Sequence, residues 1–234
     1  MSTRSRNQVV VALDGPAGAG KSTAARMLAE RLGYVLVDTG ALYRGVALAA
    51  QERGISFDDA ARLGSLIDGL ALTFERDADG RDRLHIDGAD RSGAIRTPAI
   101  SDGASRVSRH REVRAALLGL QRRLGAAGNV VLEGRDIGTV VFPDAEVKVF
   151  LTASDEARAR RRHDELSRAG HAVPLSEVLS DIRERDKRDS ERDVAPLKPA
   201  DDAILLDTSD LSLDEVVTRL VTLVRDRLGH AETR

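Results

Sequence analysis

The chain has 234 residues, which is enough for one elaborated domain or two small ones. Its net charge of −2 disfavours a protein that coats nucleic acid, because such proteins are clearly basic. It contains no cysteine, which excludes disulfides, thiolate metal sites and cysteine nucleophiles. No apolar run approaches the roughly 18 residues of a membrane span. We therefore expect a soluble, cytoplasmic protein with no membrane and no nucleic-acid partner.

The arginines are unevenly distributed along the chain. Residues 91–123 hold eight arginines and two acidic residues, whereas residues 55–90 hold nine acidic residues and four arginines. Arginine presents a planar fork of donors that suits phosphate and carboxylate groups. The first of these segments therefore indicates a surface that binds anions.

Five short apolar runs are separated by longer polar and helical stretches. They are rich in valine and leucine and show little alternation, as in strands that are buried on both faces of a parallel sheet. The runs are residues 9–13, 34–37, 130–132, 147–151 and 203–206. Helical periodicity follows two of them, over 21–32 up to Gly33 and over 41–53 up to Gly54. This alternation predicts an α/β fold with a five-stranded parallel sheet.

Two segments interrupt the alternation of strands and helices. Residues 72–75 and 83–87 alternate in polarity around a polar turn at 77–80, which predicts an inserted β-hairpin with a small helix before it. Residues 154–192 read as two strongly charged helices joined near 170–174.

A glycine-rich loop directly follows the first predicted strand. It satisfies the pattern G-x-x-x-x-G-K-[ST] between a strand and a helix, which is the required context. Its residues are Gly15, Pro16, Ala17, Gly18, Ala19, Gly20, Lys21, Ser22 and Thr23. The loop amides would surround phosphates, Lys21 would reach the β- and γ-phosphates, and the hydroxyl of Ser22 or its neighbour Thr23 would contact Mg²⁺. This predicts a nucleoside-triphosphate site. A guanine-reading N-K-x-D motif is absent, which disfavours a GTPase switch.

Charged residues follow the second and third predicted strands, where ligands of parallel sheets bind. Arg44 lies shortly after Asp38 and Thr39, and this segment either caps a helix or faces a ligand. Glu133 stands where an acid could hold the hydration shell of Mg²⁺. Next to it, Arg135 could clamp a phosphate and Asp136 could accept a hydrogen bond from an amine. The alternative for these three residues is a structural ion pair.

The whole set of motifs resembles the bacterial cytidylate kinases, within the nucleoside monophosphate kinases. The resemblance covers nearly the whole chain. Its motifs are GPAGAGKST at 15–23, DTGALYR at 38–44, SGAIRT at 92–97, EGRDIGTVVFPDA at 133–145, the arginine-rich helix at 158–162 and RDKRDSERDVAPL at 185–197. It implies a single domain with the three-layer P-loop nucleotide kinase fold. Its core would be 1–54, 110–153 and 193–234, with a small β-containing monophosphate-binding insert at 55–109 and a helical lid with the adjoining substrate helix at 154–192.

The resemblance also implies an activity and a set of roles. The reaction would be the Mg²⁺-assisted transfer of the ATP γ-phosphoryl group to CMP or dCMP, in pyrimidine nucleotide metabolism. Asp136 and Ser105 would bind the amine of cytosine, Arg114 would donate to its N3 and O2, and Thr39 and Tyr43 would line the base pocket. Arg44, Arg135 and Arg192 would hold the monophosphate, and Arg185 and Asp189 the ribose. The catalytic set would be Lys21, Arg135, Arg161, Arg162 and Arg192, with Ser22 and Glu133 at the metal.

Other interpretations of these residues stay open at this point. Asp189 and Arg192 also fit an ordinary i,i+3 surface pair, and the arginines at 158 and 160–162 fit a solvated helix face. Two other functions remain: a different P-loop small-molecule kinase, and an ATP-binding regulatory module without catalysis. The five histidines show no metal-ligand spacing, and there is no G-x-S-x-G nucleophile motif. Without a coiled-coil pattern, we expect a monomer.

Overall fold

The computed structural model describes residues 8–78 and 82–229, and their contacts divide into two compact parts. Of these residues, the first part comprises 8–37, 125–191 and 195–229. The second comprises 38–78, 82–124 and 192–194. Each part has its own hydrophobic core and is described separately below.

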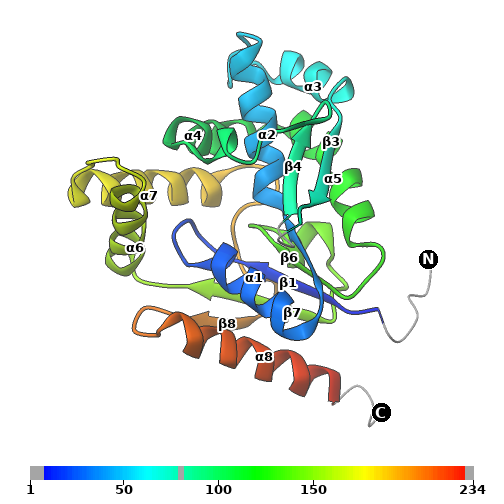
Figure 1. Cartoon of the computed structure of the whole chain (residues 1–234), viewed down its shortest axis with the longest axis vertical. Helices are drawn as coiled ribbons and strands as arrows, with labels where there is room; N and C mark the ends of the chain where they lie inside the picture. Colours follow the sequence, from blue (N-terminus) through cyan, green and yellow to red (C-terminus); the bar gives the residue numbers. More distant parts are fainter. Residues whose placement is uncertain (1–7, 79–81, 230–234) are drawn as a thin grey trace. The chain divides into compact units, whose positions relative to one another are not determined.

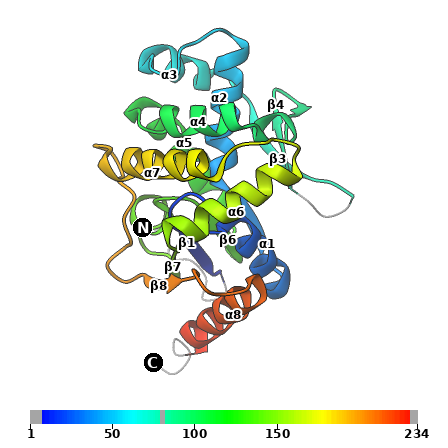
Figure 2. The same cartoon turned by 90° about the vertical axis from the view of Figure 1, so that its left-hand side faces the viewer.

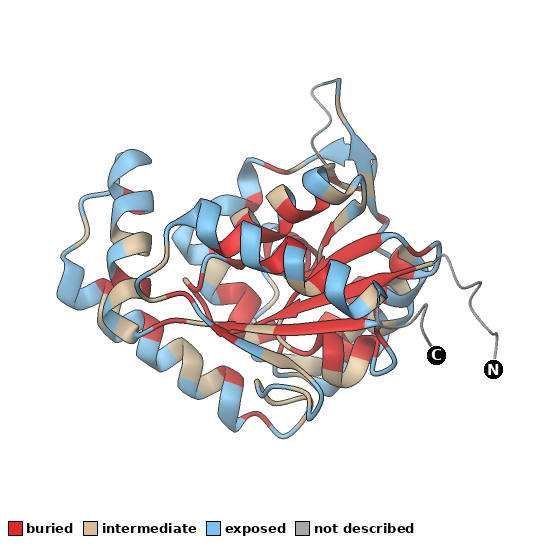
Figure 3. Cartoon of the chain, turned by 90° about the horizontal axis from the view of Figure 1, so that it is seen from below, coloured by how far each residue is buried: buried red, intermediate tan, exposed pale blue. Residues whose placement is uncertain are grey.

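A five-stranded parallel sheet forms the centre of the first part, as the apolar runs predict (Figure 1). The strand order is β2-β6-β1-β7-β8. The strands are β1 (Val10–Asp14), β2 (Val35–Asp38), β6 (Val130–Glu133), β7 (Val147–Thr152) and β8 (Ile204–Asp207). Every residue of β1 is buried, and Figure 3 shows the middle of the sheet as buried. The edge strands expose Val35 and Leu205. Each observed strand starts within one residue of its predicted start and ends one residue beyond the apolar run, at an acidic or polar residue.

Helices α1 (Lys21–Leu32) and α8 (Leu213–Gly229) cover one face of this sheet. Leu28 of α1 and Leu220 of α8 are fully buried and pack in one cluster with Val149 of β7. The predicted end of the first helix is confirmed, because Gly33 adopts a left-handed conformation with φ 68° and its N–H bonds to Ala29 and Glu30.

Two charged helices, α6 (Asp155–Arg168) and α7 (Leu175–Glu191), complete the first part with a π-helical turn at Ile137–Val141. The helices pack side by side through Ala159, Leu166, Val178 and Ile182 (Figure 2). Ser154 caps the start of α6 by accepting a hydrogen bond from the Ala157 N–H. The prediction of two helices over 154–192 is therefore confirmed.

The second part combines helices with a three-stranded antiparallel sheet. The predicted small helix and hairpin are present, and a third short strand that the sequence analysis did not predict pairs with the hairpin. Part of the predicted turn at 77–80 lies outside the described residues. The elements are α2 (Thr39–Glu52), α3 (Ala60–Asp68), β3 (Leu72–Arg76), β4 (Asp82–Ile86), β5 (Ala89–Asp90), a 3-10 turn at Ala94–Arg96, α4 (Pro98–Val107) and α5 (Arg111–Gly125).

Helix α2 is the centre of this second core. Ten of its residues are buried, and they pack with the hairpin, α3, α4 and α5. The compact part that holds the hairpin is thus larger than residues 55–109, because α2 and α5 share its hydrophobic core. Among the residues that the structure describes, no helix is long and apolar enough to cross a membrane.

The core of the first part allows a test of the packing of α8 against the sheet. We expect Leu220→Ala to lower the free energy of unfolding by about 3 kcal/mol, because the leucine is fully buried and its removal leaves a cavity. Leu213→Ala on the same helix is the control, since Leu213 is 42% exposed and its loss should change stability by less than about 0.5 kcal/mol. Urea denaturation measures both. Equal effects of the two variants would contradict this packing.

Candidate functional site

The glycine-rich loop lies between β1 and α1, with the geometry that its motif predicts. Gly15 has φ 148°, and a Cβ at this position would lie 2.0 Å from the carbonyl oxygen of Leu151 on β7. Only glycine fits this close approach, because any side chain would collide with backbone. The end of β1 therefore turns sharply into the loop, and α1 begins directly after it at Lys21.

Lys21 is buried at the first position of α1. Its Nζ donates a 2.6 Å hydrogen bond to the carbonyl of Pro16 inside the loop. Burial lowers the pKa of Lys21 well below its usual value, and the positive charge of Arg135 lowers it further. Glu133 and Asp14 oppose this effect, and Arg185 adds to it. A buried lysine with two cationic neighbours marks a place where an anion would be strongly favoured.

Ser22 and Glu133 form the next pair of groups at this site. Ser22 lies on α1 and Glu133 ends the neighbouring strand β6, and Ser22 Oγ donates a 2.8 Å hydrogen bond to Glu133 Oε2. Glu133 is 4% exposed. The structure thus distinguishes between the two neighbouring hydroxyls, since it is Ser22 that meets the carboxylate. A hydroxyl beside a carboxylate is the type of oxygen donor set that Mg²⁺ accepts.

The arginine that follows Glu133 is held by the second charged helix. Arg135 Nε donates to Asp189 Oδ2 on α7 at 3.1 Å, and its Nη1 donates to the carbonyl of Gly134 at 3.2 Å. Asp189 is 4% exposed, so it is part of a buried ion pair and not an ordinary surface residue of the helix. Lys21, Arg135, Arg185 and Asp189 therefore lie in one charged cluster within the first compact part.

Asp136 and the turn after it are supported by an acid that the sequence analysis did not single out. Asp136 is buried, and the π-helical turn at Ile137–Val141 begins directly after it. Asp14, the last residue of β1, accepts hydrogen bonds from the N–H groups of Ile137 and Gly138, both at 2.8 Å. Burial raises the pKa of Asp14 to about 6, although both hydrogen bonds lower it. The signal for Asp14 was an acid at the end of an apolar strand.

The predicted lid arginines have different environments. Arg161 donates through Nη1 to Thr208 Oγ1 at 3.0 Å, and through Nη2 to the Thr208 carbonyl. Arg162 pairs with Glu165 on its own helix at 2.7 Å. Arg158 is 3% exposed and contacts the phosphate loop, although the sequence does not distinguish it from the exposed Arg160.

Within the second compact part, Arg44 is held at the start of α2. Asp38 caps this helix by accepting from the Ala41 N–H at 2.9 Å, and its other oxygen pairs with Arg44 Nη2 at 2.6 Å. Asp38 therefore caps the helix, as one of the two interpretations of this segment predicts, and it also orients Arg44. No described residue accepts a hydrogen bond from the buried Nε of Arg44.

Two of the residues expected to bind the base, Arg114 and Tyr43, contact each other. The guanidinium of Arg114 on α5 lies 5.7 Å from the centre of the Tyr43 ring. Gln121 donates to the Tyr43 hydroxyl at 3.5 Å. Ser105 on α4 and Thr39 on α2 are buried in the same part. Arg192 is buried as well, and it groups with this second part, whereas Asp189 belongs to the first.

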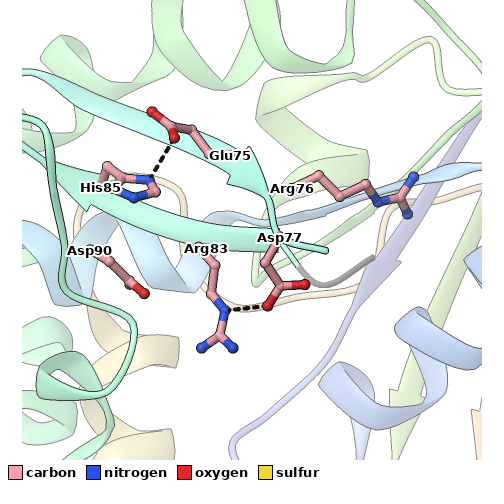
Figure 4. A pocket seen from close by; sticks show the side chains of 6 residues that line it. All are labelled: Glu75, Arg76, Asp77, Arg83, His85 and Asp90. Atoms are coloured by element: carbon pink, nitrogen blue, oxygen red, sulfur yellow. Dashed lines mark hydrogen bonds and ion pairs between the residues drawn. The ribbon is translucent and has the colours of Figure 1, made fainter. Parts of the chain in front are cut away.

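A separate cavity of about 360 Å³ lies on the hairpin (Figure 4). Its lining is charged and internally paired, with Arg83 and Asp77 at 2.7 Å and the His85 ring 3.7 Å from Glu75 (Figure 4). None of the site residues predicted from the sequence lines this cavity. It is therefore distinct from the phosphate loop and from the charged cluster.

The buried carboxyl of Asp14 predicts a specific pH dependence of stability. Its pKa is raised in the folded chain, so its stabilising contribution is complete below about pH 3.8 and is lost as the pH rises through about 6. We expect wild type to lose about 2 kcal/mol of unfolding free energy relative to Asp14→Asn between pH 4 and pH 7. Urea denaturation across this pH range checks it. If the unfolding free energies of the two proteins changed equally with pH, the raised pKa of Asp14 would be contradicted.

Comparison with known proteins shows which family the chain belongs to. The family model for cytidylate kinase matches residues 11–226. A cytidylate kinase from Geobacter sp. (strain M21) is 49% identical over 232 residues, covering 99% of both chains, and one from Geobacter sulfurreducens is 50% identical, covering 97% of both. The fold is similar to that of an uncharacterized protein from Eubacterium ventriosum, with a TM-score of 0.51, 14% identity and coverage of 94% of this chain and 99% of the other. The chain therefore belongs to the cytidylate kinase family and is a phosphotransferase that acts on nucleotides.

Proposed function

We propose that the chain transfers the γ-phosphoryl group of ATP to the 5′-phosphate of CMP and dCMP, giving CDP and dCDP. The observation that carries the proposal is the charged cluster beside the phosphate loop. There the buried Lys21 stands with Arg135 and Arg185, next to the Ser22–Glu133 pair. Clustered, buried cationic groups beside the N–H groups of a glycine-rich loop favour anionic ligands, and two phosphorylated ligands would complete such a site.

The acceptor needs little activation in this reaction. A monophosphate oxygen is already anionic at neutral pH, so catalysis consists mainly of alignment and neutralisation of charge. We assign Lys21 and the loop amides to the phosphates of ATP. Arg44, Arg135 and Arg192 would hold the monophosphate, and Arg161 and Arg162 would stabilise the transferred group. Arg185 and Asp189 would bind the ribose. Closure of α6 and α7 over ATP would exclude water, which would otherwise hydrolyse it.

The residues at the loop also suit Mg²⁺, which would neutralise phosphate charge when it is bound. Mg²⁺ in such sites keeps several waters and takes one or two protein oxygens together with the substrate phosphates. Ser22 Oγ and the Glu133 carboxylate, 2.8 Å apart, provide two such oxygens. Among residues 8–78 and 82–229 there is no group of three or more histidine, cysteine or acidic side chains that could hold a metal, which agrees with a site that the substrate completes.

Specificity for cytosine is assigned to Asp136, Ser105 and Arg114. The amine of cytosine needs an acceptor, which Asp136 and the Ser105 hydroxyl offer, and N3 and O2 need donors, which Arg114 offers. Uracil has a carbonyl where cytosine has the amine, so its oxygen would face the Asp136 carboxylate with no proton between them. An unpaired buried acceptor is a strong basis for rejecting a substrate. Thr39 and Tyr43 would form the wall of this pocket.

The acceptor preference tests the proposed function. We expect CMP and dCMP to be phosphorylated with kcat/KM at least about 100-fold above that of UMP or AMP, because the wrong base leaves polar groups unpaired. Coupled ADP-release assays over a panel of nucleoside monophosphates measure it. A preference for UMP or AMP would point to a different P-loop kinase, and nucleotide binding without acceptor-dependent turnover would point to a regulatory module.

The role of Asp136 has a direct test. We expect Asp136→Ala to lower kcat/KM for CMP by about 100-fold, because a hydrogen bond to a charged group is lost, and to reduce the preference for CMP over UMP. KM for ATP should stay within about twofold. Asp144→Ala is the matched control, since Asp144 is an exposed acid of the same segment. Unchanged discrimination in Asp136→Ala would remove this residue from base recognition.

A further inference from the structure

Arg158 is the one described arginine of the helix at 155–168 whose side chain is almost completely buried. Arg158 as a whole residue is 3% exposed, whereas Arg160 on the same helix is classed as exposed. Burying a guanidinium is costly unless its charge is balanced and its N–H groups are satisfied. The environment of Arg158 therefore needs an explanation beyond the solubility of a charged helix.

The guanidinium connects three segments of the first compact part. Nη1 donates to the carbonyl of Ala17 in the phosphate loop at 2.9 Å and lies 2.5 Å from Asp186 Oδ2 on α7. Nη2 lies 2.5 Å from Asp155 Oδ1 at the start of α6, and Nε donates to the Ala153 carbonyl at 3.1 Å. All three nitrogens are thus engaged, and two carboxylates balance the charge. Arg158 is arranged to hold protein groups in place and not to bind a phosphate itself.

The contact with Ala17 determines the orientation of a loop peptide. In a planar trans peptide the C=O of one residue and the N–H of the next point in opposite directions. The hydrogen bond from Arg158 to the Ala17 carbonyl therefore directs the Gly18 N–H away from the guanidinium. Gly18 has φ 74°, and a Cβ at Gly18 would lie 3.1 Å from both Cβ and the backbone oxygen of Arg158. The loop is thus held against α6 at the peptide whose N–H belongs to the phosphate cradle.

The contact with Asp186 extends this connection to α7. Burial raises the pKa of Asp186, and Arg158 opposes that effect. Asp189, one turn further along α7, is the partner of Arg135. The same helix therefore holds Arg158 at one turn and Arg135 at the next, so the loop and the charged cluster share one support.

We propose that Arg158 is a positioning residue for phosphoryl transfer, which orients the Ala17–Gly18 peptide of the phosphate loop and ties it to α6 and α7. The inference deepens the proposed function and rests on it for the identity of the phosphate-bearing ligand. A displacement of about 1 Å in a group that aligns reactants is enough to cost about 100-fold in rate. Arg158 would therefore affect ATP binding and turnover without touching ATP.

The test compares Arg158→Lys with Arg160→Lys. Lysine keeps the positive charge but lacks the fork that reaches a carbonyl and two carboxylates together. We expect Arg158→Lys to weaken ATP binding about 10-fold, measured by calorimetry without acceptor, and to lower kcat about 10-fold. KM for CMP should stay within about twofold. Arg160→Lys should leave all three values within about twofold of wild type, because Arg160 is exposed.

The melting temperature separates positioning from a purely structural role. A structural role alone would lower the melting temperature of Arg158→Lys and leave ATP affinity and kcat of the folded protein unchanged, and that result would overturn the proposal. If Arg158→Lys does not fold, Asp186→Asn tests the proposal in its place. This substitution removes the carboxylate charge on α7 that Arg158 contacts, and it should lower kcat/KM for ATP at least about fivefold. An unchanged kcat/KM in that variant would equally overturn it.

The same measurements keep this inference separate from the proposed reaction. If wild type binds ATP but does not release ADP in response to CMP, the proposed function fails. The calorimetric comparison of Arg158→Lys with wild type would still report whether Arg158 orients the phosphate loop. If wild type phosphorylates CMP and Arg158→Lys binds ATP and turns over as wild type does, the positioning role fails and the proposed function stands.

Discussion

Strand β1 is hydrogen-bonded on both sides, to β6 and to β7, and this pairing determines where the phosphate loop starts. Leu13 pairs with Glu133 on one side, and Asp14 pairs with Phe150 on the other. Gly15 then passes so close to the Leu151 carbonyl that no side chain would fit. With the strand end held in this way, Lys21, Ser22 and the loop amides have a rigid base. The site needs that base because catalysis by alignment depends on small displacements.

The charges around this strand end are buried, and the way they are compensated explains the contacts of the site. A buried charge is tolerated only with partners, and most of the partners here come from other elements. Glu133 receives the Ser22 hydroxyl, Asp189 receives Arg135, and Arg158 is balanced by two carboxylates. Burial lowers the pKa of Lys21, and the positive charges of Arg135 and Arg185 lower it further. A phosphorylated ligand in the loop would stabilise the charged form of this lysine.

Helix α7 supports more than one part of this arrangement. Its apolar side packs on α6 through Val178 and Ile182, while Asp186 and Asp189 receive Arg158 and Arg135. Because α7 contacts α6, Arg158 and Arg135, a movement of α7 would act on the phosphate loop and on the charged cluster together. Such a connection suits a kinase, because the γ-phosphoryl group of ATP should be transferred only when the acceptor is in place.

The sequence by itself determined the local features of this protein. Buried strands, helix starts and glycine stops depend on neighbours within a few residues, so apolar runs and the P-loop pattern predicted the sheet, α1, the hairpin and the two charged helices. The motifs also indicated the family.

Only the tertiary structure decided which side chains meet. Ser22 and Glu133 are 111 residues apart, Asp14 and Ile137 are 123 apart, and Arg158 and Ala17 are 141 apart. Their contacts depend on the strand order β2-β6-β1-β7-β8, which places distant segments side by side. For the same reason Arg158 and Arg160 look alike in the sequence, whereas packing buries one and leaves the other in water.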